Sequence, residues 1–171
     1  QSRMKPSFPL RIYMIALILR LIPILLTRGL DIGLDDMFQY DMLARSLVSG
    51  SGYRWYAQND LHLVQNYFET LNFQIPPDYD SRGVLTSFRP PLYPALLAGI
   101  YFLTGVGTGR FFIVRIAQVF LSAALVPLTY LIARKIFPQN ERGARIAAWV
   151  IVFYPLLVIY PLSLATENLF F

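Results

Sequence analysis

The stretch GLDDMFQYDMLARSLVSGSGY, residues 33–53, decides how this chain folds. From residue 36 to residue 49, its apolar side chains recur with helical spacing. A helix of this length extends about 21 Å at ~1.5 Å per residue, which is too short to span a bilayer. We therefore expect a helix over 36–49 that lies on a membrane surface with its apolar side towards the lipid. Asp36, at its start, would then stand at the boundary between lipid and water.

Two adjacent carboxylates, Asp35 and Asp36, head this helix, and two roles are open for them. Asp36 followed by Gln39 matches a capping box, in which a side-chain oxygen accepts a hydrogen bond from a backbone N–H. Asp35 fits the capping role equally well. Acids in a first turn also complement the helix dipole. The other role is chemical: a carboxylate at this place can act on a substrate whose tail lies in lipid and whose head lies in water.

The composition is that of a membrane protein. Of 171 residues, 56% are hydrophobic and 15% are charged, against about 25% charged in soluble domains. The chain has no cysteine and a single histidine, His62, so it offers no thiolate nucleophile, no disulfide and no histidine-based metal cluster. The net charge of +5 is spread over loops and helix ends, so we interpret it as an orientation signal rather than as a nucleic-acid surface.

Three hydrophobic segments are long enough to span a bilayer. We predict transmembrane helices over 10–30, 110–137 and 144–165, the last of them kinked at Pro155. The basic residues in the N-terminal segment 1–9 place that segment in the cytoplasm by the positive-inside rule.

The topology of the middle of the chain depends on the apolar run 92–103. If this run crossed the membrane, the basic residues from Arg134 to Arg145 would lie outside, against the positive-inside rule. We therefore predict a second surface helix over 91–104 and a cytoplasmic loop over 138–143. The whole segment 31–109 is then an external loop, and 166–171 begins a second one.

The predicted fold class is an all-α integral membrane protein with about three transmembrane helices and two external juxtamembrane helices. A short helix is also expected over 59–71. The chain stops inside the apolar run 168–171, so we expect it to be the N-terminal part of a longer polytopic protein.

A charge inside the first predicted span, Arg20, has two interpretations. Its side chain can snorkel to the nearer interface, or it can face the interior of the helix bundle in a functional role. With the predicted topology, Asp36, Arg89 and Glu167 all reach the outer side of the membrane.

Four motifs follow one another along the chain. The pattern D-x3-Y-x3-A-R occupies 36–45, GSGY occupies 50–53, RPPLYP occupies 89–94, and ATE ends the kinked span at 165–167. This ordered set resembles the N-terminal part of the C-type (GT-C) membrane glycosyltransferases. Within that class it is most similar to the group related to protein O-mannosyltransferases and to the aminoarabinose transferases of lipid A.

The resemblance implies an enzyme that takes a sugar from a polyprenyl-phosphate carrier. It makes Asp36, in the first external loop, the catalytic carboxylate, with Asp35 as the second candidate. This carboxylate would act as a general base, which must be ionised and within reach of the acceptor hydroxyl. It makes Arg89 the cation for the carrier phosphate, which an arginine fork binds well. The alternative is a structural role, in which Arg89 is an interfacial arginine paired with the acidic loop. Glu167 matches a second acidic position that assists a metal or orients the acceptor.

Further candidates for substrate binding are Tyr40, Tyr93 and, as the interior alternative, Arg20. Phe88 stands where the aminoarabinose transferases carry a glutamate, so no metal ligand is expected there. The resemblance leaves a divalent metal open, but the sequence requires none.

The expected partners are membrane lipids, the polyprenyl-phosphate sugar and an acceptor whose identity the sequence does not reveal, but not nucleic acid. The expected location is the cytoplasmic (inner) membrane, with the active face outside the cytoplasm. The alternative function is a non-catalytic membrane subunit that keeps a glycosyltransferase-like scaffold within a larger complex of membrane subunits.

Overall fold

The computed structural model describes residues 7–70, 72 and 74–169 of the chain. Most of these residues are helical, as predicted. Three predicted segments reach beyond the described residues: the N-terminal segment, through residues 1–6; the helix over 59–71, through Leu71; and the second external loop, through residues 170–171.

The chain forms two compact units. One unit comprises residues 1–30 and 112–171, and the other comprises residues 31–111. Each is described by itself below.

The first unit contains the long apolar helices. They are α1 (Phe8–Leu26), α5 (Arg110–Ile136, which begins in the other unit), α6 (Glu141–Phe153) and α7 (Pro155–Ile159), followed by the 3-10 turns η1 (Tyr160–Leu162) and η2 (Thr166–Leu169). Among the described residues, α1 and α5 are long and apolar enough to cross a membrane. The pair of α6 with Pro155–Leu162 is a third such segment if it counts as one span despite its 52° bend.

The core of this unit is built from small and branched apolar residues. Ile12 and Ala16 of α1 pack with Val119 and Ala123 of α5 and with Ala148 of α6, all of them buried. Small side chains of this kind let helices approach one another closely. Crossing of a membrane by these helices remains a prediction from their length and composition.

Pro155 explains the bend between α6 and α7, and Pro161 interrupts the segment again after α7. A proline has no N–H, so the carbonyl four residues before it loses its helical partner. Pro155 frees the carbonyl of Ile151 in this way, and Pro161 frees that of Leu157. The backbone of Tyr154 is extended at this point, with φ −64° and ψ 114°.

Arg20 of α1 supplies the missing hydrogen bonds. Its Nη2 donates to the Ile151 carbonyl at 3.0 Å, and its Nε donates to the Leu157 carbonyl at 3.1 Å. The Nε also donates to Ser122 Oγ at 2.9 Å, and that hydroxyl donates in turn to the Leu157 carbonyl at 3.2 Å. With 0% of its surface exposed, Arg20 lies inside the unit rather than snorkelling to a helix end.

This arrangement predicts that Arg20 and Pro155 are coupled. Arg20→Met leaves the Ile151 carbonyl without this donor and the Leu157 carbonyl with Ser122 alone, and it lowers the free energy of unfolding by about 1–3 kcal/mol. Pro155→Ala restores an N–H for Ile151, so the same Arg20 substitution costs less in a Pro155→Ala background. Denaturant unfolding of the full-length protein in detergent measures both costs. Arg142→Met, at an exposed position, is the control. Equal costs of Arg20→Met in the two backgrounds would contradict this account.

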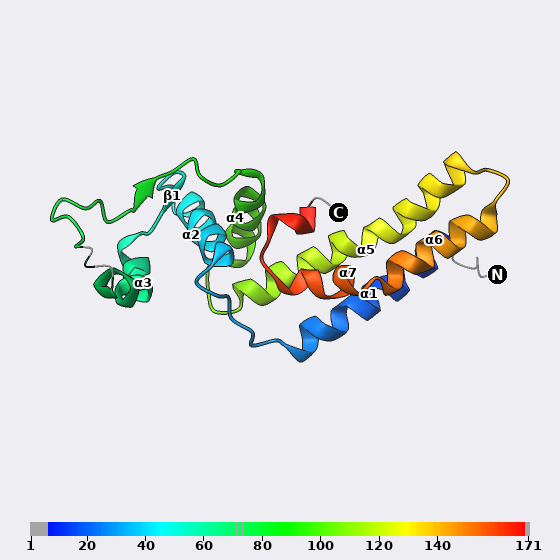
Figure 1. Ribbon diagram of the computed structural model, residues 1–171, viewed down its shortest axis with the longest axis horizontal. Helices are drawn as coiled ribbons and strands as arrows, with labels where there is room; N and C mark the ends of the chain where they lie inside the picture. The colour runs from blue at the N-terminus through cyan, green and yellow to red at the C-terminus, as the bar shows by residue number, and fades with distance from the viewer. Residues whose placement is uncertain (1–6, 71, 73, 170–171) are drawn as a thin grey trace. The chain divides into compact units, whose positions relative to one another are not determined.

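The second unit contains the stretch 33–53. Its elements are α2 (Asp36–Val48), β1 (Arg54–Trp55), α3 (Gln58–Thr70), β2 (Val84–Leu85) and α4 (Leu92–Thr104). Helices α2 and α4 lie side by side (Figure 1), and they occupy the positions where two helices were predicted. The apolar side of α2 was expected to face lipid, but Phe38 and Met42 are instead buried against α3 and β1 within the unit.

A small antiparallel sheet was missed by the all-α prediction. Strand β1 pairs with β2, with Arg54 opposite Leu85 and Trp55 opposite Val84. Strands of two residues show no alternation, so periodicity could not reveal them. Gly83 was the available signal: its φ is +91°, and a Cβ there would lie 2.3 Å from the Trp55 carbonyl oxygen. Only glycine fits at such a position.

Helix α4 is apolar on both sides. Tyr93, Leu97 and Tyr101 are buried, whereas Leu92, Phe102 and Leu103 are exposed. An exposed apolar side on an apolar helix of 13 residues agrees with the predicted location at a membrane surface.

Candidate functional site

The structure brings together two of the predicted site residues, Asp36 and Arg89. Nη2 of Arg89 donates to Asp36 Oδ1, and Nε of Arg89 donates to Gln39 Oε1 at 2.8 Å. Asp36 keeps 62% of its side chain exposed, whereas Arg89 keeps 18%. The pair therefore presents an accessible carboxylate backed by a half-buried guanidinium.

The capping question is settled by the geometry of α2. Asp35 is the N-cap, and its Oδ1 accepts from the backbone N–H of Met37 at 2.9 Å. Asp36 is the first helical residue. Gln39 does not close a capping box with Asp36, since its side-chain oxygen accepts from Arg89. The cap is thus provided by Asp35, and the carboxylate of Asp36 remains available for other contacts.

Aromatic residues hold Arg89 in place. Its guanidinium carbon lies 5.3 Å from the centre of the Tyr40 ring and 5.1 Å from that of Phe88. The Tyr53 hydroxyl donates to the Arg89 carbonyl at 3.0 Å. Burial raises the pKa of the Tyr53 phenol, so it stays protonated and remains a donor. Tyr53, the last residue of GSGY, thereby connects that motif to the RPPLYP motif.

The two predicted substrate-binding tyrosines are buried. Tyr40 of α2 and Tyr93 of α4 form an edge-to-face pair with ring centres 5.1 Å apart. Such a pair stabilises the contact between two elements. Tyr40, packed against Tyr93, therefore supports Arg89, and neither tyrosine lines an accessible surface.

The remaining candidates belong to the other unit. Glu167 is exposed in η2, and its Oε2 accepts from Thr166 Oγ1 at 3.2 Å. Arg20 is engaged with the carbonyls described above. Among the residues that the structure describes, no group of three histidine, cysteine or acidic side chains is placed to hold a metal ion.

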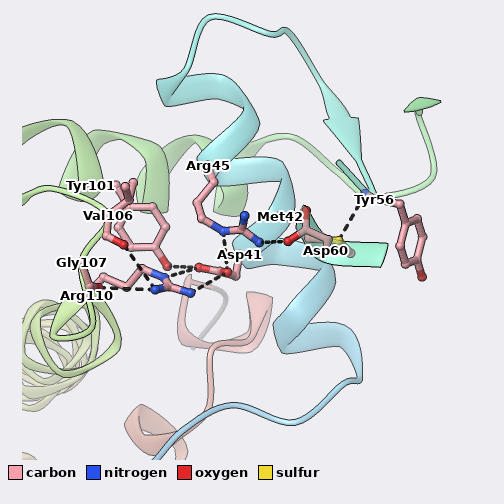
Figure 2. A network of polar contacts seen from close by, with 9 residues as sticks. All are labelled: Asp41, Met42, Arg45, Tyr56, Asp60, Tyr101, Val106, Gly107 and Arg110. Atoms are coloured by element: carbon pink, nitrogen blue, oxygen red, sulfur yellow. Dashed lines mark hydrogen bonds and ion pairs between the residues drawn. The ribbon is translucent and has the colours of Figure 1, made fainter. Parts of the chain in front are cut away.

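A buried ionic network centred on Asp41 was not anticipated (Figure 2). Asp41, 1% exposed, accepts from Arg110 Nε and Nη2 at 2.8 and 3.1 Å, from Arg45 Nε at 2.8 Å and from the Tyr101 hydroxyl at 2.8 Å. Arg45 Nη2 also donates to Asp60 at 2.6 Å. The network links α2, α3, α4 and the first residue of α5. The spacing of Asp41 and Arg45, four residues apart on one helix, was its only signal in the sequence.

The charges of the network determine its protonation. Burial alone would raise the pKa of the Asp41 carboxyl, but the hydrogen bond from Arg110 and the positive charges of Arg45 and Arg110 lower it overall. Burial and the neighbouring negative charge of Asp41 raise the pKa of Tyr101. Asp41 is therefore ionised and Tyr101 neutral, which matches their roles as acceptor and donor.

Comparisons of the chain with family models, with curated proteins and with solved structures find no match. The geometry of the site and the motif resemblance are therefore what support a function.

Removing the charge of Asp41 should loosen this unit. Asp41→Asn leaves the half-buried guanidinium of Arg110 without its carboxylate and lowers the free energy of unfolding by about 3 kcal/mol. Asp78→Asn, at an exposed carboxylate, should have almost no effect.

The acid dependence of stability provides a second readout of Asp41. A carboxyl whose pKa is lowered by folding contributes stability that is fully present above its unfolded pKa, about 4, and that is lost as the pH falls towards its folded pKa. Melting followed by circular dichroism from pH 7 to pH 3 should therefore show a shallower acid loss in Asp41→Asn than in the wild-type protein. An identical acid profile would contradict the assignment.

Proposed function

We propose that the chain belongs to a membrane glycosyltransferase that transfers a sugar from a polyprenyl-phosphate carrier to an acceptor hydroxyl on the outer face of the cytoplasmic membrane. The observation that supports this most directly is the pairing of Arg89 with the exposed carboxylate of Asp36. The same two residues are the base and the phosphate cation that the motif resemblance implies.

The pair supports phosphate binding because Arg89 is already oriented. Gln39 fixes its Nε, and Tyr40 supports the plane of the guanidinium. A guanidinium held in this way presents its fork to a phosphate with little further ordering. A carrier phosphate that binds Arg89 competes with Asp36 for the same nitrogen, and so releases the carboxylate for chemistry.

The surroundings of the pair support a lipid-linked donor. Leu34, Phe88 and Leu92 flank Asp36 and Arg89 in the sequence, and all three are exposed. Exposed apolar side chains beside an ion pair suit a ligand with a hydrocarbon chain and an anionic head.

In the proposed step, Asp36 accepts the proton of the acceptor hydroxyl. The acceptor oxygen attacks the anomeric carbon of the donor sugar, the bond from that carbon to the phosphate oxygen breaks, and the phosphate leaves on the carrier. Arg89 stabilises the negative charge that develops on the leaving phosphate. Glu167 is the proposed second acid, which orients the acceptor or assists a metal.

Adjacent aspartates give a matched pair of variants. Asp36→Asn removes the base and should reduce transfer by at least about 100-fold, the usual contribution of general-base catalysis. Asp35→Asn keeps a good N-cap residue and should leave transfer nearly unchanged. Release of polyprenyl phosphate from a panel of polyprenyl-phosphate sugars by the full-length protein measures both. Full activity of Asp36→Asn would refute the catalytic role, and absence of turnover with every donor in the folded wild-type protein would favour the non-catalytic subunit.

Arg89→Ala tests the phosphate role separately. The loss of a charge-assisted contact to the donor should raise the KM for the donor about tenfold or more. Arg142→Ala, at an exposed position in the other unit, is the matched control. A KM for the donor that is unchanged in Arg89→Ala would remove Arg89 from the donor site.

A further inference from the structure

The second unit contains a cavity that the proposed chemistry does not use. It lies at the end of α2, beside the start of α3 and the turn before β2, and its volume is ≈ 460 Å³. The polar part of its wall includes Arg45, Ser46, Ser51, Arg54, Asp60 and Arg82. Cavities of about 300–1,000 Å³ are of the size that holds small ligands.

Arginines gather around this cavity. Residues 31–111 carry eight acidic side chains and only five arginines, and three of those five arginines line the cavity. All three bind carboxylates, since Arg45 donates to Asp41 and Asp60, and Arg54 and Arg82 both donate to Asp80. The cavity therefore collects guanidinium donors rather than net charge, and an oxyanion can bind the donors that the carboxylates leave unused.

The arginines retain unused donors. Arg45 uses Nε and Nη2 to bind Asp41 and Asp60, and its Nη1 forms no hydrogen bond with the described residues, as its undashed nitrogen shows in Figure 2. Nη1 of Arg54 donates to Asp80 and to the Gly83 carbonyl, whereas its Nη2 forms no hydrogen bond with the described residues. Arg82 has 61% of its side chain exposed and donates to Asp80 through Nε and Nη2, which leaves its Nη1 unused among the described residues.

Both inner arginines are held rigidly. Arg45 is clamped between two carboxylates, and Arg54 is 15% exposed and anchored to the turn that precedes β2. Donors that are already oriented bind an oxyanion at a low entropic cost. Ser46, Ser51 and the other serines of the wall add hydroxyl groups that can bind the hydroxyls of a sugar.

We propose that this cavity binds the phosphate group of a hydroxyl-rich ligand, at a site separate from the Asp36–Arg89 pair. Arg45 follows Asp36 by nine residues, which is about 14 Å along the axis of α2. This binding site does not rest on the proposed function.

The test is direct binding of phosphate compounds to the full-length protein in detergent. The probes are inorganic phosphate, glucose 1-phosphate, glucose and dihexanoyl phosphatidic acid, measured by isothermal titration calorimetry. We expect saturable binding of glucose 1-phosphate that is tighter than that of inorganic phosphate and that weakens with salt. Tighter binding of phosphatidic acid than of glucose 1-phosphate would identify a lipid head group as the source of the phosphate. Glucose alone should bind least.

Variants locate the binding within the protein. Arg82→Gln, at an exposed position, should weaken binding about fivefold, and Ser51→Asp, which places a carboxylate in the wall, should weaken it more than about tenfold. Arg142→Gln is the surface control. Binding is compared only among variants whose melting temperature equals that of the wild-type protein, so that loss of folding is not mistaken for loss of binding.

Arg89→Ala separates this proposal from the proposed function. Binding that persists in Arg89→Ala but is lost in Ser51→Asp supports the cavity, whatever the outcome of the transfer assays. Binding that is lost in Arg89→Ala and kept in Ser51→Asp would assign the phosphate to the other site and overturn the proposal. The absence of saturable binding in the folded wild-type protein would overturn it as well.

Discussion

The buried carboxylate of Asp41 is the constraint on which the second unit depends. An isolated charge in this position would be costly, so it exists only because two guanidinium groups and a phenol surround it. Each partner comes from a different place: Arg45 from α2 itself, Tyr101 from α4 and Arg110 from the start of α5. Asp41 thus fixes α2 against its neighbours, and α2 then presents Asp36 at one end and the phosphate-binding cavity near the other.

In the first unit, a buried arginine binds backbone carbonyls and a hydroxyl instead of a carboxylate. Pro155 and Pro161 break the third apolar segment and free two carbonyls, and Arg20 reaches both of them from α1. The rigid fork of an arginine suits two acceptors in different directions. Arg20, a charge inside a predicted span, therefore binds the two carbonyls that Pro155 and Pro161 leave without a helical partner.

Local patterns predicted most of the helices but little of their chemistry. The helices over 36–49 and 91–104 follow from apolar spacing and from the prolines that precede α4, and the structure has them as Asp36–Val48 and Leu92–Thr104. The choice between Asp35 and Asp36 as the cap was not predictable, because both residues suit the position and only the exact start of α2 decides it.

The long-range contacts could not be predicted from one sequence. Asp41 meets Arg110 and Tyr101 across 69 and 60 residues, and Arg20 meets Leu157 across 137 residues. No local pattern specifies such partners. The approach of Arg89 to Asp36, across 53 residues, corresponds to the structural alternative for Arg89, an arginine paired with the acidic loop, but the sequence did not specify which carboxylate it would meet.

The central claim is that Arg89 beside Asp36 receives the phosphate of a lipid carrier, and fluorescence of Trp55 tests it most directly. The Trp55 ring lies 5.7 Å from that of Phe88, the residue before Arg89. Trp149 is the other tryptophan, so a Trp149→Phe protein reports from this place alone. Titration with polyprenyl phosphate should give a saturable change that disappears in Arg89→Ala and persists in Asp36→Asn. A saturable change that is the same in Arg89→Ala, or none in the folded Trp149→Phe protein, would contradict the account.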